Sequence, residues 1–254
     1  LSGRYLTGAI FHTAFLHCET RTGKPSAHLY VCMTTVEGDH PPLTALQADA
    51  EALAPAETEA ATFGMGCFWG RDARFGAIPG VVRTRVGYAG GTEPEPSYYS
   101  LGDHTEVVQV EYDPDALEYS DLLDVFWANH DPFSAPHKRQ YRGVVLVHDE
   151  TQREAAETSA SALSDRTGQS VETAIEALES FTLAEAYHQK YELRSTPVLG
   201  DELEDIYGPS LVDSTVSARL NGFVAGHGDP EQREALLADV ALSPAALSEL
   251  ERRL

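Results

Sequence analysis

The stretch that decides the fold is residues 64–70, "GMGCFWG", in which a single cysteine stands among glycines. The preceding residues, 60–65, predict a short β-strand, and Gly66 and Cys67 open a predicted helix that runs to about Gly76. The start of a helix presents unpaired backbone N–H groups and a partial positive charge, and both favour a thiolate over a thiol. We therefore predict a lowered pKa for Cys67 and a role as nucleophile.

The rest of the chain alternates strands and helices, and its short loops and mixed order favour an α+β fold over a doubly wound sheet. Ser120 is the expected N-cap of one helix. Towards the C-terminus, Asp229-Pro230 and Ser243-Pro244 each have the pattern of a helix start. The predicted strands are 81–88, 106–112, 141–148 and 171–178, and the predicted helices are 120–130, 150–167 and 183–191.

Charge and cysteine content limit the possible functions. The chain has 40 Asp plus Glu against 18 Lys plus Arg, a net charge of -22, which disfavours nucleic acid and anionic membranes as partners. The acidic bias and the scarcity of lysine suggest adaptation to high salt. Three scattered cysteines form no disulfide framework, so we expect a reducing, cytoplasmic location. We also expect a monomer. The ten histidines show no metal-site spacing.

The chain divides into three expected parts. Residues 1–58 have the composition of a disordered arm and linker, 59–216 form the expected catalytic domain, and 217–254 form a helical C-terminal extension. Residues 1–32 are basic in an otherwise acidic protein. Either they lie upstream of a true start at Met33, or they are a genuine disordered arm.

Several motifs together resemble the peptide-methionine (S)-S-oxide reductase family over about residues 60–192. The resemblance implies a two-layer α+β sandwich with a mixed sheet and a ferredoxin-like core. It also implies reduction of methionine-S-sulfoxide, in oxidised proteins and as the free amino acid, without a bound metal or other cofactor. The motifs are "GMGCFWG" (64–70), "GAIPGVVRTRVGYAGG" (76–91), "HTEVVQVEYDP" (104–114), "LLDVFWANHDP" (122–132), "QYR" (140–142) and "AEAYHQKY" (184–191).

The resemblance also implies the catalytic roles. Cys67 attacks the sulfoxide sulfur and becomes a sulfenic acid, and Glu106 protonates the sulfoxide oxygen. Tyr88 and Tyr141 hydrogen-bond that oxygen. A carboxyl group in an apolar setting keeps its proton to higher pH, which suits Glu106 to this role.

Other matched positions concern the substrate and the packing around it. Phe68 and Trp69 correspond to the pocket for the substrate methyl group, and two rings beside a sulfur suit a small apolar group. Glu185 and His188 also match family positions, but a packing role is as plausible for them as a catalytic one.

The loop at 133–139, "FSAPHKR", departs from the family because it lacks an aspartate that many relatives carry there. His137, Lys138 or Arg139 are candidates to supply a donor instead.

The second departure concerns turnover, because no cysteine follows Cys67 in the sequence. A sulfenic acid must be reduced by a thiol. An external reductant, either a thioredoxin-like protein or a small thiol, is the expected partner. Cys18 or Cys32 is the alternative if the N-terminal segment folds back.

Two other functions stay open at this stage. One is a module that binds methionine sulfoxide without turnover, because the aspartate loop is missing. The other is a cysteine-dependent acyl hydrolase, which would need a Cys–His pair and an oxyanion hole.

Overall fold

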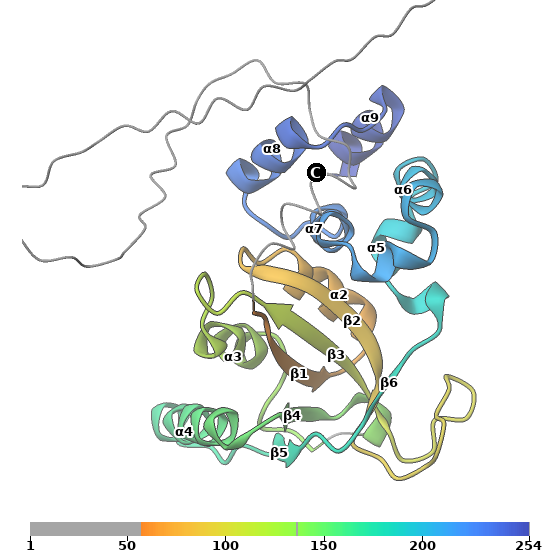
Figure 1. Ribbon diagram of the computed structural model, residues 1–254. Helices are drawn as coiled ribbons and strands as arrows, with labels where there is room; N and C mark the ends of the chain where they lie inside the picture. The colour runs from red at the N-terminus through yellow and green to blue at the C-terminus, as the bar shows by residue number, and fades with distance from the viewer. Residues whose placement is uncertain (1–56, 136, 254) are drawn as a thin grey trace, which may run out of the picture. The chain divides into compact units, whose positions relative to one another are not determined.

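A computed structural model of the protein describes residues 57–135 and 137–253 (Figure 1). Almost all of the predicted arm, including the two readings of residues 1–32 and the resolving roles of Cys18 and Cys32, lies outside the described residues. Within them, no helix is both long and apolar enough to cross a bilayer.

The described residues form a six-stranded sheet in the order β5-β4-β1-β3-β2-β6. The pair β4–β5 is parallel and the other pairs are antiparallel, so the predicted α+β fold with a mixed sheet is confirmed. The finer assignment, a two-layer ferredoxin-like core, stays a prediction. The strands are β1 (Glu59–Met65), β2 (Val81–Ala89), β3 (Thr105–Tyr112), β4 (Gly143–Val147), β5 (Ala174–Ala177) and β6 (Phe181–Leu183).

Helices pack on this sheet through an apolar core. Phe63 of β1 stacks on Phe75 at a ring-centroid distance of 5.3 Å and on Phe126 at 5.1 Å, which joins the sheet to α2 and α3. The α-helices are α2 (Phe68–Gly76), α3 (Tyr119–Ala128), α4 (Glu150–Thr167), α5 (Tyr191–Arg194), α6 (Leu199–Tyr207), α7 (Thr215–Val224), α8 (Pro230–Asp239) and α9 (Pro244–Arg253). The 3₁₀ helices are η1 (Arg139–Tyr141), η2 (Ala186–His188) and η3 (Gly208–Asp213).

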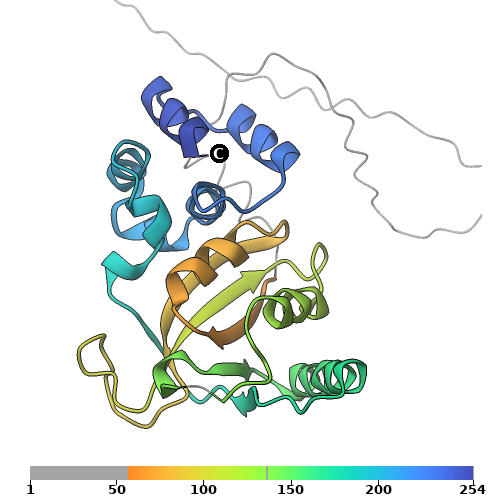
Figure 2. The same ribbon diagram turned by 180° about the vertical axis from the view of Figure 1, so that it is seen from behind.

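The C-terminal helices form a second apolar cluster next to α2. Figures 1 and 2 both show α5 to α9 gathered at one end of the sheet. Helices α2 and α7 approach so closely that a Cβ on Gly76 would lie 2.4 Å from the carbonyl oxygen of Ala218. The predicted C-terminal helices are therefore confirmed. The proposed division at residue 216 falls within α7 and stays a prediction.

Several predicted element boundaries were wrong. The strand predicted at 171–178 covers only residues 174–177, and the helix predicted to end at residue 130 ends at 128. Two other differences concern where an element begins. The N-cap of α3 is Glu118, not Ser120, because Glu118 and Asp121 satisfy each other's backbone N–H groups in a capping box. The predicted strand 141–148 begins only at residue 143. Tyr141 lies in η1 instead, where its N–H donates to the carbonyl oxygen of Lys138.

The predicted helix 183–191 was also wrong, since this segment is the end of β6, then η2, then the start of α5. The reason is tertiary. The side chain of Gln189 accepts a hydrogen bond from the N–H of Val86 at 3.0 Å and donates to its carbonyl oxygen at 2.8 Å. These bonds replace the sheet contacts that a strand would make, and they hold the chain extended.

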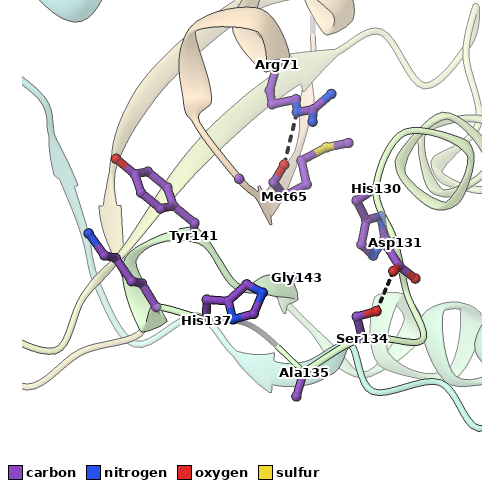
Figure 3. A pocket seen from close by; sticks show the side chains of 11 residues that line it. Met65, Arg71, His130, Asp131, Ser134, Ala135, His137, Tyr141 and Gly143 are labelled. Atoms are coloured by element: carbon purple, nitrogen blue, oxygen red, sulfur yellow. Dashed lines mark hydrogen bonds between the residues drawn. The ribbon is translucent and has the colours of Figure 1, made fainter.

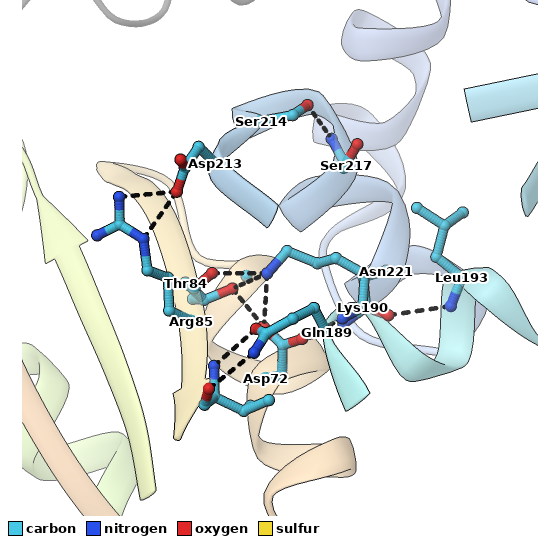
Figure 4. A network of polar contacts seen from close by, with 12 residues as sticks. Asp72, Thr84, Arg85, Gln189, Lys190, Leu193, Asp213, Ser214, Ser217 and Asn221 are labelled. Atoms are coloured by element: carbon cyan, nitrogen blue, oxygen red, sulfur yellow. Dashed lines mark hydrogen bonds and ion pairs between the residues drawn. The ribbon is translucent and has the colours of Figure 1, made fainter. Parts of the chain in front are cut away.

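The next residue is anchored by a buried polar network (Figure 4). Lys190 is fully buried, and its Nζ lies 3.1 Å from Oδ1 of Asp72 and 2.6 Å from the carbonyl oxygen of Thr84. Its backbone N–H also donates to Asp72 at 2.9 Å. The network links α2, β2 and the start of α5, and it fixes where the chain passes the end of the sheet.

Candidate active site

Cys67 lies at the junction of β1 and α2, as predicted. It is the N-cap residue of α2, with non-helical backbone angles, and it is exposed. Gly66 before it has a φ of 92°, a conformation that favours glycine. The glycine therefore lets the chain turn sharply and present the sulfur at the start of the helix.

The predicted lowering of the Cys67 pKa is wrong for this structure. Loss of hydration raises the pKa of the thiol, and the nearby charge of Glu106 raises it further. The backbone N–H of Trp69 and the guanidinium of Arg71 lower it, but they do not outweigh desolvation. The helix terminus thus acts in the predicted direction, and the surroundings that the fold adds decide the outcome.

Glu106 lies beside the cysteine. Strand β3 places it at the start of α2, where its Oε2 accepts the N–H of Phe68 at 3.2 Å and its Oε1 accepts Nε2 of Gln140 at 2.7 Å. The residue is 2% exposed, and burial raises the pKa of its carboxyl group despite both hydrogen bonds. The structure therefore brings a thiol and a carboxyl group with a raised pKa to one place.

The two predicted tyrosines reach the site differently. Tyr88 pairs with Glu106 across β2 and β3, but its hydroxyl donates to Glu185 at 2.8 Å. Its single O–H hydrogen is thus already engaged. Tyr141 is 38% exposed, and its hydroxyl donates to no other described residue. Desolvation and the charge of Glu106 raise the pKa of Tyr141, so its O–H is kept as a donor near the carboxyl group.

Both predicted pocket aromatics are held firmly. Trp69 stacks on Tyr191 with ring centroids 3.7 Å apart, and its Nε1–H donates to Nδ1 of His188 at 3.0 Å. Phe68 is 1% exposed, with its ring 6.0 Å from that of Tyr88 and 5.1 Å from that of His188. Because Phe68 is covered on these sides, its ring forms the floor of an aromatic cluster rather than an exposed wall.

Glu185 and His188, whose roles the sequence left open, hold other site residues. Glu185 accepts from the Tyr88 hydroxyl and from the N–H of Tyr98. Burial lowers the pKa of His188, and the neutral ring accepts the Trp69 N–H on Nδ1.

Three contacts were missed at the level of sequence. Gln140 bonds Glu106, Tyr191 stacks on Trp69, and the ring of Tyr98 lies 4.9 Å from that of His188. The first two stand inside motifs already quoted, "QYR" and "AEAYHQKY", so their motif membership was the available signal.

Arg139, in the loop that lacks the aspartate, does not supply a donor to the site in its place. The guanidinium of Arg139 donates to the carbonyl oxygens of Asp103 and Gly90, at 2.6 and 2.7 Å. His137 and Lys138 line a neighbouring cavity instead. Among residues 57–135 and 137–253, no group of three or more His, Cys, Asp or Glu side chains could hold a metal ion.

Comparison with known proteins shows the family. The model of the peptide methionine sulfoxide reductase family matches residues 59–201. A peptide methionine sulfoxide reductase of Drosophila melanogaster is 44% identical over 187 residues, which cover 72% of this chain and 75% of the relative. The enzyme MsrA of Methanothermobacter thermautotrophicus is 47% identical over 144 residues, or 52% of this chain and 85% of the relative.

A solved structure agrees with these matches. The crystal structure of reduced Mxr1 from Saccharomyces cerevisiae is 30% identical with a TM-score of 0.51, and the match covers 56% of this chain and 88% of that one. The chain therefore belongs to the peptide methionine sulfoxide reductase family, and its class of enzyme is an oxidoreductase that reduces methionine sulfoxide.

Proposed function

We propose that the chain reduces the S epimer of methionine sulfoxide with Cys67 as nucleophile and Glu106 as proton donor. The observation that supports this most is the hydrogen bond from the N–H of Phe68 to Glu106. It holds a buried carboxyl group beside the residue that carries the reactive sulfur.

The first half-reaction transfers one oxygen atom. The Cys67 sulfur attacks the sulfoxide sulfur while the Glu106 carboxyl protonates the sulfoxide oxygen, which makes the sulfur a better electrophile. As the S–O bond breaks, the oxygen ends on Cys67 as a sulfenic acid and the substrate leaves as a thioether. Cysteine sulfur is oxidised by two electrons and substrate sulfur is reduced by two. The proton lost by the thiol replaces the one given by the carboxyl group.

The tyrosines and the aromatic cluster orient the sulfoxide. The hydroxyl of Tyr141 donates to no other described residue, so it can donate to the sulfoxide oxygen without first breaking a hydrogen bond. Tyr88 can donate to that oxygen only after its O–H leaves Glu185. The face of Trp69, fixed by Tyr191 and His188, packs against the methyl group.

The second half-reaction needs an outside thiol. Cys67 is the only cysteine among the described residues. Two thiol groups of a thioredoxin-like protein or of a small thiol reduce the sulfenic acid, which releases water and a disulfide. Disulfide formation with Cys18 or Cys32 is the competing route.

The test is reduction of each purified sulfoxide epimer with dithiothreitol as the electron donor. The wild type should reduce the S epimer and leave the R epimer, and Cys67→Ser should produce no methionine. Equal rates on both epimers, or turnover by the serine variant, would overturn the proposal.

A further inference from the structure

A cavity of about 610 Å³, lined by Gly66 and Tyr141 among other residues, opens next to the turn that carries Cys67. Arg71 of α2 and Tyr141 of η1 line this cavity, and His130, Asp131 and Ser134, which follow α3, lie across it from Tyr141 (Figure 3). Cys67 does not itself line the cavity. Its neighbour Gly66 does, so a molecule held there lies next to the sulfur.

The cations of this cavity lack acidic partners. The Nε of Arg71 donates to the carbonyl oxygen of Met65 at 3.0 Å, but no carboxylate of a described residue pairs with its guanidinium. The same holds for Lys138. By contrast, Lys190, the other lysine in the described part of the chain, is buried against Asp72.

The acidic side chain of the cavity and one of its histidines already form hydrogen bonds with the protein. Asp131 is the one acidic residue among those lining the cavity. Its carboxylate is turned towards its own loop, where it accepts the N–H of Phe133 and the hydroxyl of Ser134. Both ring nitrogens of His130 are engaged, with the carbonyl oxygen of Phe126 at 2.7 Å and Oγ1 of Thr173 at 2.9 Å. His130 therefore has no free ring nitrogen. The donors left for a ligand are the terminal N–H groups of Arg71, the side chains of His137 and Lys138, and the hydroxyl of Tyr141.

Arg71 also connects the cavity to the reactive sulfur. Its helix begins directly after Cys67, and its guanidinium lies close enough to the thiol to lower the pKa of Cys67. A guanidinium suits a carboxylate because its N–H groups match both oxygens. An anion that contacts Arg71 therefore lies close to the place where the sulfur reacts.

We propose that this cavity is a carboxylate-binding subsite, in which Arg71 and Lys138 receive the carboxylate of a small molecule that reacts at Cys67. The inference builds on the proposed function. Two molecules carry the required group: free methionine sulfoxide through its α-carboxylate, and a small thiol reductant that bears a carboxylate.

The first test does not depend on turnover. Iodoacetamide, which is uncharged, alkylates the exposed Cys67, and succinate should slow this reaction while succinamide should not. In Lys138→Ala the protection should be about two- to fivefold weaker, the loss of one exposed ion pair. Lys138→Arg should keep it. Arg166→Ala, which removes an exposed cation on α4, is the matched control and should match the wild type.

The second test separates the two sources. One arm compares N-acetylmethionine sulfoxide with its neutral N-methylamide in a single turnover. The other arm compares mercaptosuccinate with 2-mercaptoethanol in reduction of the preformed sulfenic acid. In each arm, the preference is the ratio of the rate with the charged compound to the rate with the neutral one. If Lys138→Ala lowers this ratio in the first arm, the ligand is the sulfoxide substrate; if it lowers the ratio in the second arm, the ligand is the thiol reductant.

Equal protection by succinate and succinamide, or a charge preference unchanged by Lys138→Ala in both arms, would overturn the subsite. If the subsite fails in this way but the neutral sulfoxide is still reduced, the proposed reductase function remains supported. If neither neutral nor charged sulfoxide were reduced, the reductase proposal would fail, and the alkylation experiment would still decide the subsite.

Discussion

The substitution Glu106→Gln should change two rates at the same sulfur in opposite directions. The carboxyl group is 2% exposed and accepts two hydrogen bonds, from the N–H of Phe68 and from Nε2 of Gln140. The oxygen of the new amide can take the Phe68 N–H. Its NH₂ group can donate to Gln140 once that side chain turns its own amide over. Both hydrogen bonds survive, so the free energy of unfolding should change by less than about 1 kcal/mol.

The chemical effects are larger. An amide cannot protonate the sulfoxide oxygen, and a positioned general acid contributes about 10²- to 10⁴-fold, so sulfoxide reduction in a single turnover should slow by that factor. The same change removes a negative charge that raises the pKa of Cys67. A larger fraction of the sulfur is then thiolate at a given pH, and alkylation by iodoacetamide should become faster.

The pH dependence gives a further check on the pair. In the wild type, the reacting form holds one proton between Cys67 and Glu106. The reduction rate should therefore fall once the pH exceeds the higher of the two macroscopic pKa values. The variant has no carboxyl group to lose a proton, so its slow rate should keep rising with the thiolate fraction. Stopped-flow reduction of a neutral sulfoxide and alkylation followed by mass spectrometry measure both rates. Unchanged sulfoxide reduction, or slower alkylation, would refute the reasoning.

Two further substitutions test the packing around the site. Lys190→Met leaves the carboxylate of Asp72 buried without its cation. Urea denaturation should show a free energy of unfolding that is lower by about 3–5 kcal/mol. Adding Asp72→Asn should recover part of this loss, and no recovery would count against a buried ion pair. Gly76→Ala should lower the free energy of unfolding by about 1–3 kcal/mol, because the new Cβ would meet the backbone of Ala218. The control Gly70→Ala, whose Cβ would have nothing within 4 Å, should leave this free energy unchanged or raise it. Equal effects of the two substitutions would show that α2 and α7 do not touch at Gly76.

Local patterns predicted the parts of this molecule that depend on nearby residues. The strand before Cys67 and the helix after it follow from a short apolar run and a pair of glycines. The helix starts at Asp229-Pro230 and Ser243-Pro244 follow from capping preferences, and the structure has helices at both places. The motif around Glu106 placed this residue on a strand, where it is found.

The failures come from contacts between distant residues. The predicted helix at 183–191 does not form because Gln189 and Lys190 are bound by groups about 100 residues earlier in the chain. The sign of the Cys67 pKa shift depends on desolvation and on Glu106, and neither is visible in "GMGCFWG". The cavity at Arg71 and Lys138 likewise needs the fold, because these residues come from α2 and from the loop before η1.

Transfer of the sulfoxide oxygen to one sulfur atom is the step on which all the proposed chemistry depends. It can be followed by incubating the enzyme, without reductant, with methionine-S-sulfoxide that carries a heavy oxygen isotope, and then weighing the peptide that contains Cys67. We predict that this peptide gains one heavy oxygen atom for each methionine formed. Release of methionine with neither a label on Cys67 nor a disulfide from Cys67 to Cys18 or Cys32 would contradict the account.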